Sequence, residues 1–293
     1  MIYKNLSKIK HLCVALVIAL LASACATNRV VPITGRKQRV DVADGVMLSA
    51  IIPHYNKEVQ STGISSNKTQ TAMVNRVTKR LTNAAVEYLK KNGYSSELQW
   101  YQWEVHLLRN QEPNACCYPG GKIVVYEGIL PIVGSEAGLA AVLGHEIGHA
   151  IGKHSAEAYT KQEFKLKFQK LGAAALQLAG SDPTTAKQAV ALSNQLLEYV
   201  EMKYSRKHEH EADHIGLILM AMAGYDPNEG PKVWERMTAA FGDNTIRILS
   251  THPSNAKRMR WMRDKWMQEA LRYYKPRTSQ KSKSYSKKRA KGI

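Results

Sequence analysis

The pentapeptide His145-Glu146-Ile147-Gly148-His149 is a HExxH motif surrounded by apolar and small residues. Its histidines are four positions apart, slightly more than one α-helical turn, so both imidazoles project from one helix face and can bind one Zn²⁺. Glu146 lies about 100° around the helix, beside the metal and not on it, which is the position of a general base. The fold must therefore hold this helix rigidly, with His145 and His149 as metal ligands and Glu146 as a catalytic residue.

A second HExxH match, His210-Glu211-Ala212-Asp213-His214, lies in a highly charged run. The charge of that run, and of Asp213 within the motif, favours the first motif as the catalytic pair. Catalytic zinc usually has three protein ligands and one open position, so a third ligand must come from elsewhere. We expect the second segment to supply it, from the candidates His208, Glu209, His210, Glu211 and His214.

Helical periodicity favours Glu209 among these candidates. Glu209 and Asp213 share one helix face with Ala212 and Gly216, small residues that permit a close approach to the first motif. Glu209 would then bind the metal, and Asp213 would orient a ligating histidine through its second nitrogen. The face that carries Glu211 is partly apolar as well, so Glu211 stays open as an alternative.

Hydrophobic periodicity predicts an α+β fold, mostly α-helical, with a small early β-sheet packed on the active-site helices. Ser135 is the predicted N-cap of the HExxH helix, which runs to about Gly152. Cys116 and Cys117 are predicted to be free, because adjacent cysteines rarely bond to each other. A strand is expected near 103–107, a hairpin with strands 114–118 and 122–126, and further helices at 71–92, 160–179, 184–200, 206–223, 231–241 and 254–273.

Residues 1–24 have the pattern of a lipoprotein signal peptide, with a basic start and an apolar stretch. The apolar stretch is shorter than the roughly 20 residues that span a bilayer. Leu21-Ala22-Ser23-Ala24-Cys25 resembles the bacterial lipobox, which makes Cys25 the predicted lipidation site; an ordinary signal peptide cut near a cysteine is the alternative. Residues 25–50 are predicted to be a linker or arm, and residues 51–273 the catalytic domain.

The net charge of +18 is concentrated at the two ends of the chain. Residues 274–293 carry eight basic residues and no acidic one, which predicts a disordered basic tail. This tail either binds anionic lipid headgroups or is simply solvated. Nucleic acid is not an expected partner, because the basic residues are not interleaved with aromatic ones and no recognised binding fold is evident.

The HEIGH motif, followed 60 residues after His149 by Glu209-x-x-x-Asp213, resembles the HtpX/LoiP/BepA-type gluzincin zinc metallopeptidases, the family of the CaaX prenyl protease. Three further stretches agree, so that the resemblance covers most of residues 30–265: Thr34-Gly35-Arg36, the segment 114–128, and Thr251-His252-Pro253 with Arg258. The resemblance implies a zincin-like domain with one Zn²⁺ per chain, Glu209 as the third ligand and Asp213 behind the ligands.

The resemblance also gives roles to two residues outside the motifs. His252 is implied to lie near the metal, either as a catalytic residue that stabilises the oxyanion or as a latch on the open zinc position; the alternative is an ordinary residue at a helix N-terminus. Arg258 is implied to hold acidic groups near the site, or merely to solvate its helix.

Without polytopic membrane segments, the resemblance points to the periplasmic lipoprotein branch of the family. It implies an endopeptidase that degrades unfolded or misfolded envelope proteins in outer-membrane protein quality control, with substrates extended along a sheet edge formed by residues 122–126. Ala26 after the cysteine implies a periplasmic protein held by its lipid anchor at the outer membrane of a Gram-negative bacterium. The alternative is a chaperone-like or latched zinc lipoprotein that binds outer-membrane proteins without routine proteolysis.

Overall fold

The computed structural model of the protein describes residues 28–164, 166, 205–242, 248, 252 and 256–276. The chain divides into two compact units, and in the described part the smaller comprises residues 28–30, 37–42 and 156–166 without 165. The larger unit comprises residues 31–36, 43–155 and all described residues from 205 onward. The predicted lipidation site Cys25, the helix predicted at 184–200, most of that predicted at 160–179 and nearly all of the basic tail lie outside the described residues.

The smaller unit contains an antiparallel strand pair, β1 (Asn28–Val30) and β2 (Lys37–Arg39). The backbone N–H of Asp41 donates a hydrogen bond of 3.0 Å to the hydroxyl of Thr160 in the following helical segment. Strands therefore occur within residues 25–50, the range predicted to be a linker.

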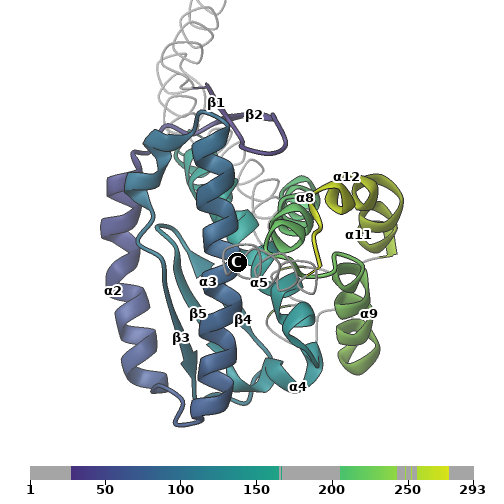
Figure 1. The fold of residues 1–293 in the computed structure, drawn as a ribbon. Coiled ribbons are helices and arrows are strands. Elements are labelled where there is room, and N and C mark those ends of the chain that lie inside the picture. Colours follow the sequence, from purple (N-terminus) through teal and green to yellow (C-terminus); the bar gives the residue numbers. More distant parts are fainter. Residues whose placement is uncertain are drawn as a thin grey trace, which may run out of the picture. The chain divides into compact units, whose positions relative to one another are not determined.

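A three-stranded sheet in the larger unit has the order β3–β5–β4 (Figure 1). β3 (Glu104–Leu108) runs parallel to β5 (Lys122–Tyr126), and β4 (Ala115–Tyr118) runs antiparallel to it. The predicted strand and hairpin are thus confirmed. The expectation that residues 122–126 form the substrate-binding edge is wrong, because β5 is paired on both sides and only β3 and β4 are edge strands.

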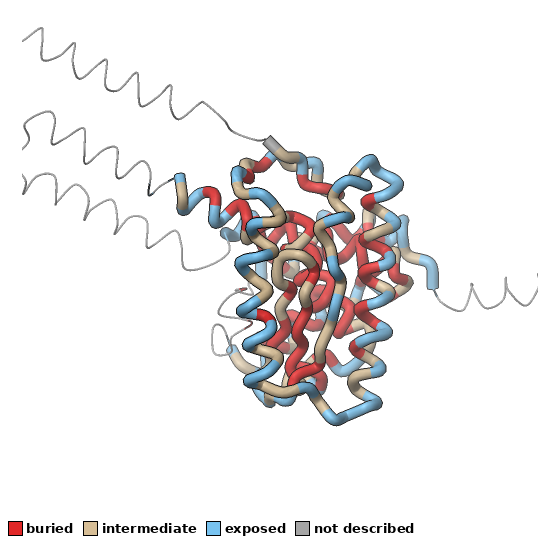
Figure 2. The backbone as a smooth tube through the Cα atoms, turned by 90° about the vertical axis from the view of Figure 1, so that its left-hand side faces the viewer, coloured by how far each residue is buried: buried red, intermediate tan, exposed pale blue. Residues whose placement is uncertain are grey.

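Both faces of this sheet are covered, as the alternation along β5 shows. Ile123 and Val125 are buried in the main core, with side chains of α3 (Lys68–Lys91) and α5 (Glu136–Ile151). Val124 and Tyr126 are buried on the other face with Tyr55 of α2 (Asp44–Thr62). Figure 2 shows the resulting distribution, with buried residues gathered inside and the outer helices alternating between buried and exposed positions.

α5 and α8 (Arg206–Met222), the helices that carry the two HExxH matches, pack closely against each other. A Cβ atom on Gly148 would lie 2.8 Å from the carbonyl oxygen of Ala212, and one on Gly216 would lie 2.8 Å from the backbone nitrogen of His145. This confirms that small residues allow the close approach. Ser135 caps α5 as predicted, because its hydroxyl accepts a 3.0 Å hydrogen bond from the N–H of Gly138.

The rest of the larger unit is helical. α4 (Leu130–Val133) precedes α5, and α9 (Glu229–Phe241) follows α8. α11 (Ala256–Trp261) continues through a π-helical turn at Met262–Trp266 into α12 (Met267–Tyr273). Among the described helices, none is by itself long and apolar enough to cross a membrane; the bent pair Glu127–Val133 and Glu136–Ile151 passes only jointly, by length and composition. The predicted fold class, α+β and mostly helical, is confirmed.

One helix of the larger unit, α2, was not predicted from the sequence. It contains Pro53, which removes one backbone hydrogen bond, and Tyr55 is the one buried residue among its 19. A helix that buries so little lacks the apolar periodicity on which sequence-based prediction depends.

Candidate metal centre

Donor atoms from α5, α8 and the segment before α11 converge at one place in the larger unit. The Nε2 atoms of His145 and His149 are 3.1 Å apart, and the Glu209 carboxylate lies 3.4 Å from the first and 3.3 Å from the second. The Nδ1 atom of His252 lies 3.2 Å from His145 Nε2 and 3.1 Å from Glu209 Oε1. All four side chains are buried.

These separations fit zinc. Nitrogen and oxygen ligands lie at about 2.0–2.1 Å from tetrahedral Zn²⁺, which places neighbouring ligand atoms about 3.3 Å apart. The oxygen Oε2 of Glu209 is buried and makes no well-aligned hydrogen bond, although the Arg258 guanidinium lies 3.0 Å from it as an ion-pair partner. Two imidazoles and one carboxylate also form a donor set that zinc prefers.

Asp213 and Arg258 support the ligands from behind. Asp213 Oδ1 lies 2.9 Å from His145 Nδ1, so the carboxylate accepts the ring proton there and leaves Nε2 free for a metal. Arg258 donates to both oxygens of Asp213 at 2.7 and 2.8 Å, and its Nη1 atom lies 3.0 Å from the Glu209 carboxylate. All three side chains are buried, so the guanidinium compensates two carboxylates that water cannot reach.

The electrostatics of the ligands follow from burial and these contacts. Burial opposes protonation of His145, but hydrogen bonds to Asp213 and Glu209 outweigh it and raise its pKa to about 9. The carboxylates thus favour a positive charge at this place, which a metal ion supplies. Burial lowers the pKa of His149 well below its usual value, which keeps this imidazole neutral. Burial opposes the charged form of Glu209, yet Arg258 and His252 hold its pKa well below the usual range.

Glu146 lies beside the donor set and not within it. Its side chain is buried, and Oε1 has no hydrogen-bond partner in the described structure. That oxygen lies 3.6 Å from Nε2 of His252, whose other ring nitrogen faces the ligands. A buried carboxylate in this position can accept a proton from a solvent molecule at the metal.

Sequence reasoning left Glu211 open as a ligand and missed the importance of His154. Glu211 does not face the donor set: its carboxylate binds His154, Arg36 and Thr34. His154 is fully buried, and its Nδ1 atom lies 2.9 Å from Nδ1 of His149. His154 lies beyond the end of α5 at Ile151, five residues after His149, and the sequence does not show that Glu211 covers it.

The strand β4 lies next to the site. It packs against α5, and its buried Cys117 thiol has a pKa raised by burial, by the neighbouring Cys116 and by the Glu146 carboxylate. Neither cysteine forms a disulfide within the described structure, as predicted. β4 is an edge strand of the described sheet, with β5 as its neighbour.

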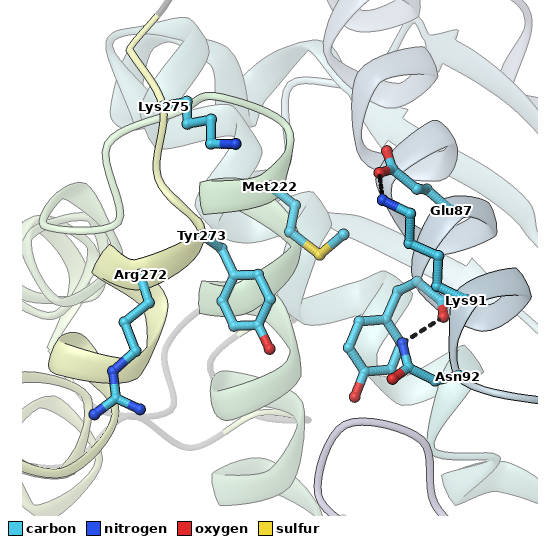
Figure 3. A pocket seen from close by; sticks show the side chains of 8 residues that line it. Glu87, Lys91, Asn92, Met222, Arg272, Tyr273 and Lys275 are labelled. Carbon is cyan, nitrogen blue, oxygen red and sulfur yellow. Dashed lines mark hydrogen bonds and ion pairs between the residues drawn. The ribbon is translucent and has the colours of Figure 1, made fainter.

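A separate hollow of about 460 Å³ lies between the C-terminal parts of α3, α8 and α12 (Figure 3). Its one carboxylate, Glu87, is paired with Lys91 at 2.6 Å. None of the described residues that line the hollow is a histidine or cysteine. It is lined by Glu87, Tyr88, Lys91, Asn92, Met222, Arg272, Tyr273 and Lys275.

Comparison with known proteins gives one family. The family model described as peptidase family M48 matches residues 69–265. The chain is 38% identical over 248 residues to the mitochondrial metalloendopeptidase OMA1 of Schizosaccharomyces pombe, a match that covers 82% of this chain and 66% of the relative. It is 39% identical over 187 residues to that of Arabidopsis thaliana, covering 64% and 36%. The beta-barrel assembly-enhancing protease of Escherichia coli is 28% identical over 156 residues, covering 52% and 32%.

These matches correct the predicted location. The chain spans between 32% and 66% of the length of these relatives. Two of them are mitochondrial by name, which contradicts a periplasmic lipoprotein at the outer membrane of a Gram-negative bacterium. The lipoprotein branch of the family is likewise not supported. A basic start, an apolar stretch and a cysteine form a short pattern, and Cys25 lies outside the described residues.

Proposed function

The chain belongs to peptidase family M48, and on that premise we propose that it is a zinc metalloendopeptidase that cleaves unfolded or misassembled proteins. The observation that carries the proposal is the convergence of His145, His149 and Glu209 around one point, with the buried carboxylate of Glu146 beside it. One relative is named a beta-barrel assembly-enhancing protease, which supports substrates among proteins that assemble at membranes.

In the proposed mechanism, His145, His149 and Glu209 hold the metal. Asp213 orients His145, and Arg258 holds Glu209. Zinc, when bound, supplies a Lewis acid that polarises the scissile carbonyl and lowers the pKa of water to about 7. Glu146 accepts the proton of the attacking water and later donates it to the departing amine. Because Glu146 is buried, bulk water is excluded from its carboxylate, and its electrostatic interaction with the attacking water is stronger.

We expect an extended substrate to bind along β4, an edge strand of the sheet. An edge strand offers main-chain N–H and C=O groups to a peptide, and such pairing needs a substrate without stable structure of its own. β4 fits this role because it packs against α5 and places Cys117 near Glu146. The preference for unfolded segments follows from main-chain recognition.

His252 acts as a latch in this proposal. Its Nδ1 atom lies within 3.2 Å of His145 Nε2 and of Glu209, so the imidazole fills the fourth side of the donor set. That side is the one a substrate carbonyl and its attacking water must use. Substrate binding therefore requires the ring to move aside.

Replacing His252 by alanine tests the latch directly. If the ring competes with substrate, His252→Ala should raise basal cleavage of an unfolded protein several-fold at unchanged zinc content. A ring that stabilises the oxyanion instead predicts a loss of about 10²–10³ in kcat. Initial cleavage rates of fluorescent casein distinguish the two; a rate lowered to that extent would rule out the latch, with His214→Ala as the control outside the donor set.

The contact of His252 with His145 and Glu209 also favours a second function. A protein whose zinc site stays latched would bind unfolded proteins without routine proteolysis. We expect cleavage of casein by the wild type, its loss when a chelator removes zinc, and its return when zinc is added in stoichiometric amount. Binding of unfolded protein without cleavage, in the wild type and in His252→Ala alike, would favour the chaperone-like alternative and contradict the peptidase.

A further inference from the structure

A chain of polar side chains lies behind His149, on the side away from the donor set. Nδ1 of His149 lies 2.9 Å from Nδ1 of His154, and Nε2 of His154 lies 2.9 Å from Glu211 Oε2. The Glu211 carboxylate also accepts from Arg36 Nε at 2.7 Å and from the Thr34 hydroxyl at 2.5 Å. His149, His154 and Glu211 are all buried.

The contact geometry allows one direction of hydrogen bonding when a metal is bound. If His149 binds the metal through Nε2, its proton is on Nδ1, so His149 donates to His154. His154 must then accept at Nδ1 and carry its own proton on Nε2, from which it donates to Glu211. Glu211 then only accepts hydrogen bonds from this series of side chains, as an ionised carboxylate does.

Thr34 and Arg36, the outermost members of this series of side chains, belong to a loop that backbone hydrogen bonds close. The backbone N–H of Val31 donates to the carbonyl of Arg36 at 2.8 Å, and that of Gly35 donates to the carbonyl of Val31 at 3.0 Å. Ile33 has a φ of 71°, a conformation that a β-branched residue rarely adopts. Such backbone strain persists only where surrounding contacts maintain it. The loop therefore holds Thr34 and Arg36 in fixed positions against Glu211.

We infer that His154 and Glu211, held by Thr34 and Arg36, position the imidazole of His149 for metal binding. His145 is supported directly by Asp213, which Arg258 holds, whereas His149 is supported through His154 by Glu211, which Arg36 holds. The segment before α2 is by this inference part of the metal site. The inference rests on the proposed function, in which His149 is a zinc ligand.

Zinc affinity is the measurement that a positioning role changes. Loss of a residue that orients a metal ligand typically weakens metal binding by about 10–100-fold. We expect this increase in the Kd for zinc for His154→Phe, which keeps an aromatic ring beside His208 but cannot form hydrogen bonds, and for Arg36→Met. Arg36→Lys should recover part of the loss because it keeps the charge beside Glu211. Arg39→Met, a change in β2 at an arginine that pairs with Asp41, should leave the Kd unchanged.

The experiment is a competition titration of each full-length variant with a chromophoric zinc chelator, with circular dichroism of the apoprotein as the test of folding. A histidine-selective NMR spectrum of the zinc-loaded wild type gives a second readout that needs no variant, and it should show His149 protonated on Nδ1 and His154 on Nε2. Unchanged Kd values for folded His154→Phe and Arg36→Met, or a His154 protonated on Nδ1, would overturn the inference. A wild-type protein that binds no zinc would instead contradict the proposed function itself.

Discussion

Replacing Glu146 by glutamine is expected to lower the rate of peptide cleavage by about 10²–10⁴-fold, the range over which general acid–base groups contribute. Glutamine has nearly the same shape but cannot accept a proton from water at neutral pH. Glu146 is not among the donors that converge on the metal, so zinc content should stay at the wild-type level. The measurement is casein cleavage and zinc content for both proteins side by side.

Glu112→Gln is the matched control for this change, because Glu112 is exposed in the loop before β4 and is not one of the donor residues. It should cleave at the wild-type rate. Full activity of Glu146→Gln would contradict its assignment as the base. Loss of zinc together with activity would show that Glu146 supports metal binding and not proton transfer.

Replacing Arg258 by methionine should lower the free energy of unfolding of the apoprotein by about 3–5 kcal/mol, the usual cost of leaving a buried charge without its partner. Arg258 is buried and contacts both Asp213 and Glu209, whose charges no water can then screen. Urea unfolding in the presence of a chelator measures the loss. Saturating zinc should recover part of it, because the metal compensates the Glu209 carboxylate.

Arg260→Met provides the control for this second change, since Arg260 is an exposed arginine of the same helix. Its unfolding free energy should stay within about 0.5 kcal/mol of the wild type. An equally small effect of Arg258→Met would mean that Asp213 and Glu209 are not held as charged groups. A loss that zinc does not reduce would mean that Arg258 stabilises the fold through Asp213 or through its contact with Trp234, and not through Glu209.

The two site helices were predictable because their sequences carry local signals. The HExxH spacing fixes a helix, Ser135 marks its start, and small residues at Ala212 and Gly216 mark the face along which α8 approaches α5. These features depend on helix geometry alone, which a sequence contains. The third ligand was harder, because Glu209 and Glu211 lie on different faces of one charged helix and only the packed structure shows which of them faces α5.

Features that depend on contacts between distant segments were not predictable. His154 is buried because Glu211, 57 residues later, and the loop at Thr34 and Arg36 close over it. β5 is central because β3 pairs with it in parallel although β4 lies between them in sequence, a pairing that no local pattern specifies. The location of the protein was predicted from a short N-terminal pattern, and its relatives contradict it.

The most direct test of the central claim is a crystal structure of the protein grown with zinc, with anomalous diffraction measured on both sides of the zinc absorption edge. We predict a single peak per chain bounded by Nε2 of His145, Nε2 of His149 and the carboxylate of Glu209. A zinc peak elsewhere, such as between His210 and His214 of the second motif, with these three side chains apart, would contradict it.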